Sequence, residues 1–395
     1  MGVAADGDTA REPVVAWLSL GFGYGGDLMY FEQLFEGLQS RFPKAIVPVA
    51  SSFPVQRYPK LPLLPILKFA DIPLPRRQAG GSAYATVVRL ATPASVIRLG
   101  RERPEVLVIT EFSLVSLAGW LLAKLRRIPL VLLVESDPSY RGAPSAPAVM
   151  AVKSFIARRC DAILVSNQLG ADYLTKNLRV APDRIRIGPY LTSNPAGPTP
   201  TSTGRRTGRV RLLFLNSITQ RKGVAEMLRA LARTPLELRD SWQLDVVGSG
   251  DQEAEVRRLT AELDLTANVI WHGRVPFPET GEFYRQADVV ISPTLADYRS
   301  LSGFEAVNAG RALITSVHDG ASEELVRLAH SVRLVDPLDQ ESFAEALRPY
   351  LTRSDWLRAQ AAAAQKPPVE FSVEAACDNL AATINDALDR RAGRA

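Results

Sequence analysis

Residues 289–316 read VVISPTLADYRSLSGFEAVNAGRALITS and contain one full unit of the pattern that runs through the chain. The stretch begins and ends with short apolar runs, Val289 to Ser292 and Ala312 to Ser316, and the segment FEAVNAG between them looks helical. Continuous apolar runs of this kind are typical of parallel strands that are covered on both faces. A strand, a helix and a second strand in this order predict the crossover unit of a doubly wound sheet.

The same alternation extends toward both ends of the chain. Further strand-like apolar runs lie at 14–20, 106–110, 130–135, 162–166, 210–215, 244–247, 269–272 and 332–335. Helix-length segments separate them, for example 114–127, 146–159, 224–233 and 253–263. We therefore predict an α/β protein with two Rossmann-like, doubly wound parallel-sheet domains that face each other across a cleft.

The alternation is interrupted once, at residues 194–208, which read NPAGPTPTSTGRRTG and cannot build a core. We predict a first domain over residues 1–195, a linker over 196–208 and a second domain over 209–370. Residues 371–395 read as a final helix with Ser372 as its N-cap and apolar side chains at spacings of three and four. No strand follows this helix, so we expect it to dock back on the first domain.

The composition is that of an ordinary soluble protein. The 395 residues give room for two domains, and 46% of them are hydrophobic and 23% charged. The polar start of the chain predicts no signal peptide, and no run approaches the roughly 18 apolar residues of a spanning helix. Cys160 and Cys377 match no metal or redox spacing and fit a reduced, cytoplasmic compartment.

Basic residues punctuate an apolar, proline-rich stretch, residues 58–77, YPKLPLLPILKFADIPLPRR. Its prolines argue against one long helix, so we expect a loop with at most a short helical turn. The net charge of +5 is compatible with an anionic membrane surface or with a plain solvated face. Nucleic acid is not expected as a partner, because the sequence has no recognition helix, zinc spacing or aromatic-rich RNA-binding signature.

Ligands of open parallel sheets bind beyond the carboxyl ends of the strands, so the loops after each strand are the candidate site. Arg221 and Lys222 lie in the loop after the 210–215 strand, at the entrance to a helix, and would suit a diphosphate. The bland alternative is a pair of solvated basic residues. Gly248 opens the glycine-rich turn GSGD, which is a weak signal because such turns occur in many α/β proteins.

The most informative loop carries two acids separated by seven residues, Asp297 and Glu305. Glu305 would fall in the first turn of the following helix, where a carboxylate can accept two ribose hydroxyls. Ser300, Leu301 and Ser302 would present backbone N–H groups to phosphate oxygens at the helix start. Taken alone, a carboxylate in this place more often compensates the helix dipole.

Taken together, these loops resemble a known family. The segments RKG, VVGSGD, VIWHGRV, YRQADVVISPT, the 297–305 element, EAVNAG, DGASEELV and LVDPLDQESFAEAL follow one another across residues 221–347. Their order and spacing resemble the C-terminal domain of the large retaining GT-B family of mannosyl- and glucosyltransferases, glycosyltransferase group 1. The resemblance implies that Lys222 binds the donor diphosphate with help from Arg221, and that Glu305 binds the ribose hydroxyls.

The resemblance implies further roles for matching positions. Asp297 stands where the family usually has a glutamate that contacts the donor sugar. Ser300 and Leu301 occupy the family's Gly-Leu, whose amides meet the β-phosphate. Gly25 and Gly26 look like the paired glycines after the first strand, which let the backbone approach the donor.

The chain also departs from the family pattern. Asn216 and Ser217 lie where an arginine is common, Asp297 is one methylene shorter than glutamate, and Ser300 lacks the freedom of glycine. The family's histidine at the end of a first-domain strand is missing.

The matching strand end reads VESD, and it offers Glu135 and Asp137, while Glu111 ends the preceding strand. We interpret Glu135 and Asp137 as candidate catalytic contacts, with a solvated strand terminus as the open alternative. His272 and His318 end strands of the second domain and are expected to pack or to bond to backbone.

These features predict a retaining glycosyltransferase that moves a sugar from a nucleoside diphosphate sugar to a hydroxyl of a saccharide, lipid-linked or small-molecule acceptor. We expect no cofactor and no metal. We expect a cytoplasmic protein, with peripheral contact at the inner face of the membrane through residues 56–77 as a further hypothesis. That stretch folded onto its own domain is the alternative.

Two other classes of function are weighed. The first is a non-catalytic nucleotide-sugar-binding subunit, which would keep Lys222 and Glu305 but lose Asp297 and the first-domain acids. The second is a Rossmann oxidoreductase, which requires a glycine spacing that FGYGGD does not supply.

Overall fold

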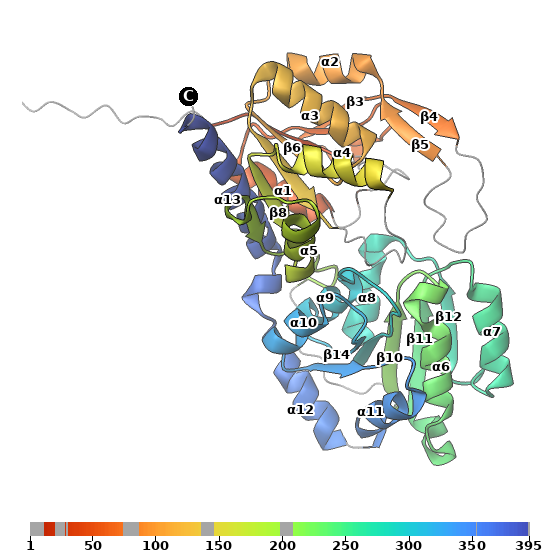
Figure 1. The fold of residues 1–395 in the computed structure, drawn as a ribbon. Helices are drawn as coiled ribbons and strands as arrows, with labels where there is room; N and C mark the ends of the chain where they lie inside the picture. The colour runs from red at the N-terminus through yellow and green to blue at the C-terminus, as the bar shows by residue number, and fades with distance from the viewer. Residues whose placement is uncertain are drawn as a thin grey trace, which may run out of the picture.

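The computed structural model describes residues 12–19, 28, 31–73, 87–135, 146–197, 208–352 and 354–393. Two parallel sheets organise these residues, one in each half of the chain (Figure 1). The fold agrees with the sequence prediction of an α/β, GT-B-like architecture, and each strand expected from the sequence is present, with its ends within two residues of those expected.

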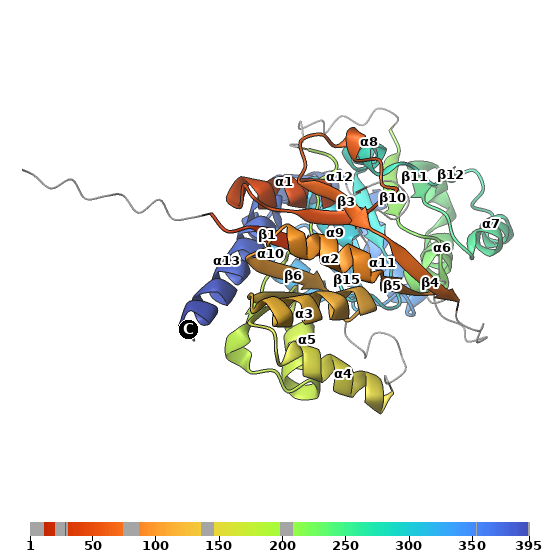
Figure 2. The same ribbon diagram turned by 90° about the horizontal axis from the view of Figure 1, so that it is seen from above.

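The first sheet has the strand order β1-β6-β7-β8-β9, with all neighbours parallel. Its strands are β1 (Val15–Leu18), β6 (Val106–Thr110), β7 (Leu130–Val134), β8 (Ala162–Val165) and β9 (Ile185–Ile187). Helices α3 (Leu114–Arg126) and α4 (Pro147–Ala157) pack on one face, and α1 (Phe31–Arg41) and α13 (Val373–Ala392) pack on the other (Figure 2). Both faces are therefore buried, as the continuous apolar runs predict.

The second sheet has the order β12-β11-β10-β13-β14-β15, again parallel throughout. Its strands are β10 (Val210–Leu215), β11 (Trp242–Val247), β12 (Val269–Gly273), β13 (Val289–Ser292), β14 (Ala312–Ser316) and β15 (Val332–Val335). The chain builds outward from β10 in one direction and from β13 in the other. The loops after β10 and β13 therefore flank the switch point at which such sheets bind ligands.

Seven helices cover the two faces of the second sheet within the described residues. One face carries α6 (Val224–Ala232), α7 (Glu253–Glu262), α11 (Gln340–Thr352) and α12 (Ser354–Ala364). The other face carries α8 (Phe277–Gln286), α9 (Leu301–Asn308) and α10 (Ser322–Leu328). The second set is the one that borders the first half of the molecule (Figure 1).

The last helix, α13, packs on the first sheet, where the apolar stripe of its sequence predicts it to dock. Ser372 caps it, because its hydroxyl accepts the N–H of Ala375 at 3.1 Å. Leu380 and Ile384 are buried against α1 and the strands, and each such side chain stabilises the contact by about 1.5–3 kcal/mol. Within the described residues, the chain therefore crosses back from the second sheet to the first at its end.

Residues 56–77 do not form the expected loop. Two strands occupy most of the described part, β3 (Leu63–Leu67), which pairs with β2 (Val47–Ala50), and β4 (Phe69–Pro73), which pairs with β5 (Val87–Ala91). The prolines exclude a helix, but a strand at the edge of a small sheet tolerates them.

The apolar side chains of this stretch also turn inward, since Ile66 and Leu67 are only 6% and 2% exposed. The described part is thus folded onto its own domain. Arg76 and Arg77 lie outside the described residues.

Candidate functional site

The candidate site forms where the loops after β10, β11, β13 and β14 meet at the switch point. The side chain of Asn216 donates to the Ser302 hydroxyl at 3.3 Å, joining the first loop to the start of the helix that follows the third. The N–H of Leu295 donates to the carbonyl of Arg221 at 2.7 Å. The N–H of Asp297 donates to the carbonyl of His318 at 3.2 Å, joining the third loop to the fourth. The structure therefore gathers the second-half residues that the sequence predicts for the donor.

Asp297 is bound to both predicted cations. Its Oδ2 accepts hydrogen bonds from Nη1 of Arg221, at 2.9 Å, and from Nζ of Lys222. Lys222 is only 7% exposed, so burial lowers the pKa of its amine, while the Asp297 carboxylate opposes that shift. A diphosphate would find two cations here, but in this structure an aspartate carboxylate of the chain itself occupies them.

The turn that presents Lys222 depends on a glycine. Gly223 ends the 3-10 turn Gln220–Lys222 with φ of 70°, and a Cβ on it would lie 1.9 Å from the carbonyl oxygen of Pro293. The predicted ligand glycine, Gly248, has a similar explanation. Its φ is 142°, and a Cβ there would lie 1.9 Å from the carbonyl oxygen of Asn216. Both glycines are thus required for loops to pack against each other.

The start of α9 is also occupied by a carboxylate. Oδ1 of Asp319 accepts the N–H of Ser300 at 3.4 Å and the N–H of Ala321 at 3.0 Å. Asp319 is 1% exposed, and burial together with nearby Asp297 raises its pKa to about 6. The Ser300 amide, predicted to meet a phosphate, therefore has an anionic partner in the chain already, which suits the positive end of a helix.

Glu305 is buried and paired with two hydroxyls. Its carboxylate accepts from Oγ of Ser193 at 2.5 Å and from Oη of Tyr284 at 2.7 Å, and the residue is 5% exposed. Burial raises the pKa of Glu305, while both hydroxyls oppose the shift. The prediction that Glu305 lies in the first turn of the helix is wrong. Because α9 starts at Leu301, Glu305 is its fifth residue and lies in the second turn.

Helix α9 holds the crossover between the two halves. Nδ2 of Asn308 donates to the carbonyl of Phe371 at 2.9 Å and to that of Ser193 at 3.2 Å. Nη1 of Arg299 donates to the carbonyl of Leu191 at 2.6 Å. The helix that carries the predicted ribose acid is therefore also fixed to both segments by which the chain passes between its halves.

Glu135, the predicted first-domain acid, follows β7 and faces the 297–305 element. Its backbone N–H donates to Oε1 of Glu111 at 2.5 Å. Burial and the Glu111 charge raise the pKa of Glu135 to about 8, while Arg299 and Tyr190 oppose the shift. Glu135 thus interacts across the interface with Arg299. Asp137, Gly25 and Gly26 lie outside the described residues.

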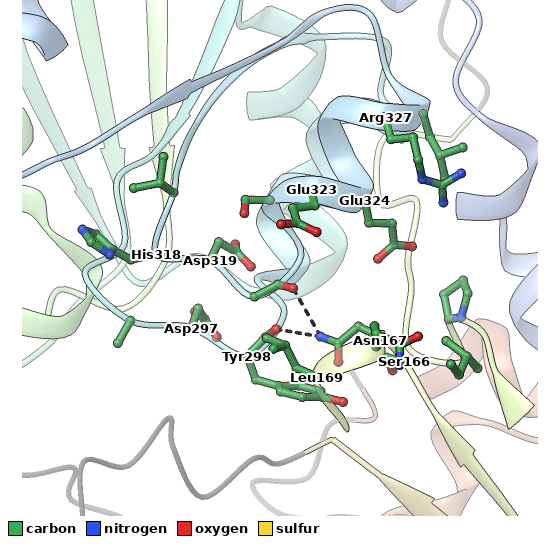
Figure 3. A pocket seen from close by; sticks show the side chains of 18 of the residues that line it. Ser166, Asn167, Leu169, Asp297, Tyr298, His318, Asp319, Glu323, Glu324 and Arg327 are labelled. Atoms are coloured by element: carbon green, nitrogen blue, oxygen red, sulfur yellow. Dashed lines mark hydrogen bonds between the residues drawn. The ribbon is translucent and has the colours of Figure 1, made fainter. Parts of the chain in front are cut away.

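A cavity of about 840 Å³ opens beside Asp297, between the two halves (Figure 3). Its walls come from the segments that follow β8, β9, β13 and β14. Nδ2 of Asn167 donates across it to the carbonyls of Tyr298, at 3.2 Å, and Gly320, at 3.5 Å. A cavity of this size between two domains, with a few convergent polar groups, is typical of a small-molecule site.

Sequence reasoning missed several residues that shape this region, namely Asn167, Ser193, Tyr284, Arg299 and Asp319. Three of them carried a usable signal, since Asn167 directly follows a predicted strand and Arg299 and Asp319 lie in the loops after two others. Ser193 and Tyr284 carried none, because their role depends on the tertiary contact with Glu305.

Comparisons with known proteins agree with this geometry. Residues 199–366 match the family described as Glycosyl transferases group 1, and residues 29–190 match the Glycosyl transferase 4-like domain. The D-inositol 3-phosphate glycosyltransferase 1 of Catenulispora acidiphila is 27% identical over 297 residues, which cover 70% of this chain and 71% of that protein. The lipopolysaccharide glucosyltransferase WaaG of Escherichia coli is 30% identical over 144 residues, covering 36% of this chain and 37% of that protein.

Among solved structures, HepE of Anabaena in complex with UDP superposes with a TM-score of 0.72 at 14% identity. The match covers 94% of this chain and 99% of that one. At this identity the likeness concerns the fold, which is the GT-B arrangement of two Rossmann-like halves.

Proposed function

Because the chain is a glycosyltransferase of the group 1 family with the GT-B fold, we propose that it transfers a sugar, with retention, from a nucleoside diphosphate sugar bound at the β10/β13 switch point. The observation that carries the proposal is the meeting of Arg221, Lys222 and Asp297 at that point. Two cations beside a helix start form an anion site, and an acid beside a cavity can hold sugar hydroxyls.

In the proposed reaction, the bond between the anomeric carbon and the diphosphate oxygen breaks, and a bond from that carbon to the acceptor oxygen forms. Lys222 and Arg221 neutralise the charge that develops on the departing diphosphate. The acceptor proton passes to a phosphate oxygen of the leaving group. These cations take the part that a divalent metal plays elsewhere, so a chelator is expected to leave the transfer rate unchanged.

Binding of the donor requires two exchanges of partner in the site. Asp297 must release Lys222 and Arg221 to the diphosphate, after which its carboxylate is free for a donor sugar hydroxyl. Glu305 must exchange the Ser193 hydroxyl for the ribose hydroxyls. Each exchange replaces one charge-assisted contact by another, so donor binding proceeds without leaving a buried charge unpaired.

The proposed acceptor is a hydroxyl of a saccharide, a lipid-linked molecule or a small polyol. The names of the relatives support this range, because one acts on D-inositol 3-phosphate and another on lipopolysaccharide.

We place the reaction in the cytoplasm. The 56–77 stretch buries Ile66 and Leu67 in its own domain, so these two side chains are not available for a membrane contact. Among the described residues, no helix has the length and apolar character needed to cross a membrane.

A panel of UDP, GDP and ADP and their common sugar derivatives tests the proposal. One nucleotide should raise the melting temperature of the chain, because a ligand that binds only the folded state stabilises it. Glu305→Ala should weaken that nucleotide by about 1–3 kcal/mol. The anomeric configuration of the product, read by NMR, tests retention. No stabilisation by any member of the panel would contradict the donor site itself.

A further inference from the structure

We propose that the outward face of α3 and α4 binds an anionic membrane surface. This α3–α4 face is distinct from the donor site, because it lies on the first sheet's outer helices (Figures 1 and 2). It is built from six exposed apolar side chains, Leu114, Leu121, Leu125, Val149, Val152 and Phe155. These are six of the fifteen large apolar side chains that are exposed in the described part of the chain.

The first step of the argument is that α3 is apolar on both sides. Val115, Leu122 and Ala123 are buried against the sheet, while Leu121 and Leu125 point outward with 51% and 74% exposure. A helix on the surface of a soluble domain normally has a polar outer face, and one that is apolar all round is normally covered. The outer side of α3 is therefore unusually apolar for an exposed helix face, with three exposed leucines beside Lys124 and Arg126.

The second step is that α4 extends the same surface. The Trp120 ring of α3 and the Phe155 ring of α4 are 5.3 Å apart, so the two helices are neighbours. Val149, Val152 and Phe155 recur at spacings of three on α4 and are 47%, 51% and 44% exposed. Scattered exposed apolar residues are ordinary on a soluble protein, but a cluster on two adjacent helices marks an interaction surface.

The third step is the charge carried by the two helices themselves, which is of one sign. Residues 112–134 and 146–160 contain six basic residues, Lys124, Arg126, Arg127, Lys153, Arg158 and Arg159, and no acidic residue. Apolar side chains flanked by lysine and arginine suit the boundary between anionic headgroups and acyl chains. A second copy of the chain fits less well, because a two-fold contact would bring these six cations against their own copies.

Sedimentation of the full chain with vesicles tests the proposal. The chain should bind vesicles of equimolar phosphatidylglycerol and phosphatidylcholine at low salt, bind vesicles of phosphatidylcholine alone far less, and be weakened by added salt. The variant Lys124→Glu/Arg126→Glu should lower vesicle affinity about tenfold or more, since each basic residue near an anionic surface contributes about fivefold. The variant Leu121→Ser/Leu125→Ser should lower it as well.

A matched control lies on the other half of the molecule. Arg233→Glu/Leu236→Ser changes one exposed cation and one leucine whose 74% exposure equals that of Leu125, and it should bind vesicles as the unchanged chain does. The melting temperature without nucleotide or vesicles, measured for every variant, shows that the chain remains folded.

Two results would overturn the proposal. The first is absence of vesicle binding at low salt, or binding that both α3 variants leave unchanged. The second is a concentration-dependent dimer, seen by light scattering, that Leu121→Ser/Leu125→Ser dissolves, which would assign the face to self-association.

Discussion

The two carboxylates of the 297–305 element lie in opposite surroundings. Asp297 meets two cations and lines a cavity, whereas Glu305 is buried against the hydroxyls of Ser193 and Tyr284. One end of the 297–305 element therefore contacts the cations of the candidate diphosphate site. The other end contacts the segments in which the chain crosses between its two halves. The seven-residue spacing puts both acids on one structural unit, but their partners decide what each acid can bind.

This difference shows that the polar groups expected to bind the donor are already bound to other side chains of the protein. Carboxylates of Asp297 and Asp319 hold the cations and the helix start that would receive phosphate, and Ser193 holds the acid that would receive the ribose. Donor binding is thus a competition with internal contacts at both ends of the element. Substitutions at each end should show which side chains bind the donor and which compete with it for the same partners.

The largest effect is expected at the charged end, from Lys222→Ala. The change removes a buried cation from the diphosphate site and should weaken the stabilising nucleotide by about 1.5–3 kcal/mol, or roughly 10- to 100-fold. Calorimetric titration measures it, with the exposed Lys366→Ala as control. Equal affinity in the two variants would remove Lys222 from the donor site.

Asp297→Asn tests the competition at the same end, and its two readouts should move in opposite directions. Neutral asparagine holds Lys222 and Arg221 less strongly than a carboxylate does, so nucleoside diphosphate affinity should rise by about 3- to 10-fold. Sugar transfer should fall at the same time, because the acid that contacts the donor sugar is lost. Weaker nucleotide binding in this variant would show that Asp297 orders the cations instead of competing for them.

The contacts of Asp297 could be predicted from the sequence because its partners lie in a loop that follows the neighbouring strand of the sheet. Arg221, Lys222 and Asp297 follow strands that are neighbours in a parallel sheet, and carboxyl ends of such strands meet at one edge. The strand positions followed from continuous apolar runs, since these strands are covered on both faces.

The other end was harder to predict. Ser193 precedes the linker, and Tyr284 belongs to α8, and nothing in their local sequence indicates that they meet Glu305. The 63–73 strands were missed for a related reason. Proline argues against helix but does not distinguish a loop from an edge strand, and the pairing partners lie elsewhere in the chain.

Glu135→Gln tests the electrostatic interaction between Glu135 of the first half and Arg299 of the 297–305 element. The pKa of Glu135 is raised from 4.5 to about 8, so between these values the folded chain holds a proton that the unfolded chain has released. Stability should therefore fall as pH rises through this window. Above pH 8 the glutamine variant should exceed the unchanged chain in free energy of unfolding, and the difference should vanish near pH 4.5.

Urea denaturation at pH 6 and pH 9 measures this difference, and the exposed Glu237→Gln is the control. If the variant is instead less stable at pH 9, the Glu135 carboxylate is ionised and its attraction to Arg299 outweighs its burial.

The smallest effect is expected at the buried end, from Ser193→Ala. Ser193 donates to Glu305 at 2.5 Å and is fully buried, so its removal should lower stability by about 1 kcal/mol. If Glu305 binds ribose, loss of this competing hydroxyl should also raise nucleotide affinity by about 2- to 5-fold.

Thr192→Val is the matched control, because Thr192 donates to Phe371 in the same crossover and makes no hydrogen bond to Glu305 among the described contacts. It should lower stability similarly and leave nucleotide affinity unchanged. Weaker nucleotide binding in Ser193→Ala alone would mean that the serine positions Glu305 for the ribose, and the two ends of the element would then differ in kind, with competition at Asp297 and support at Glu305.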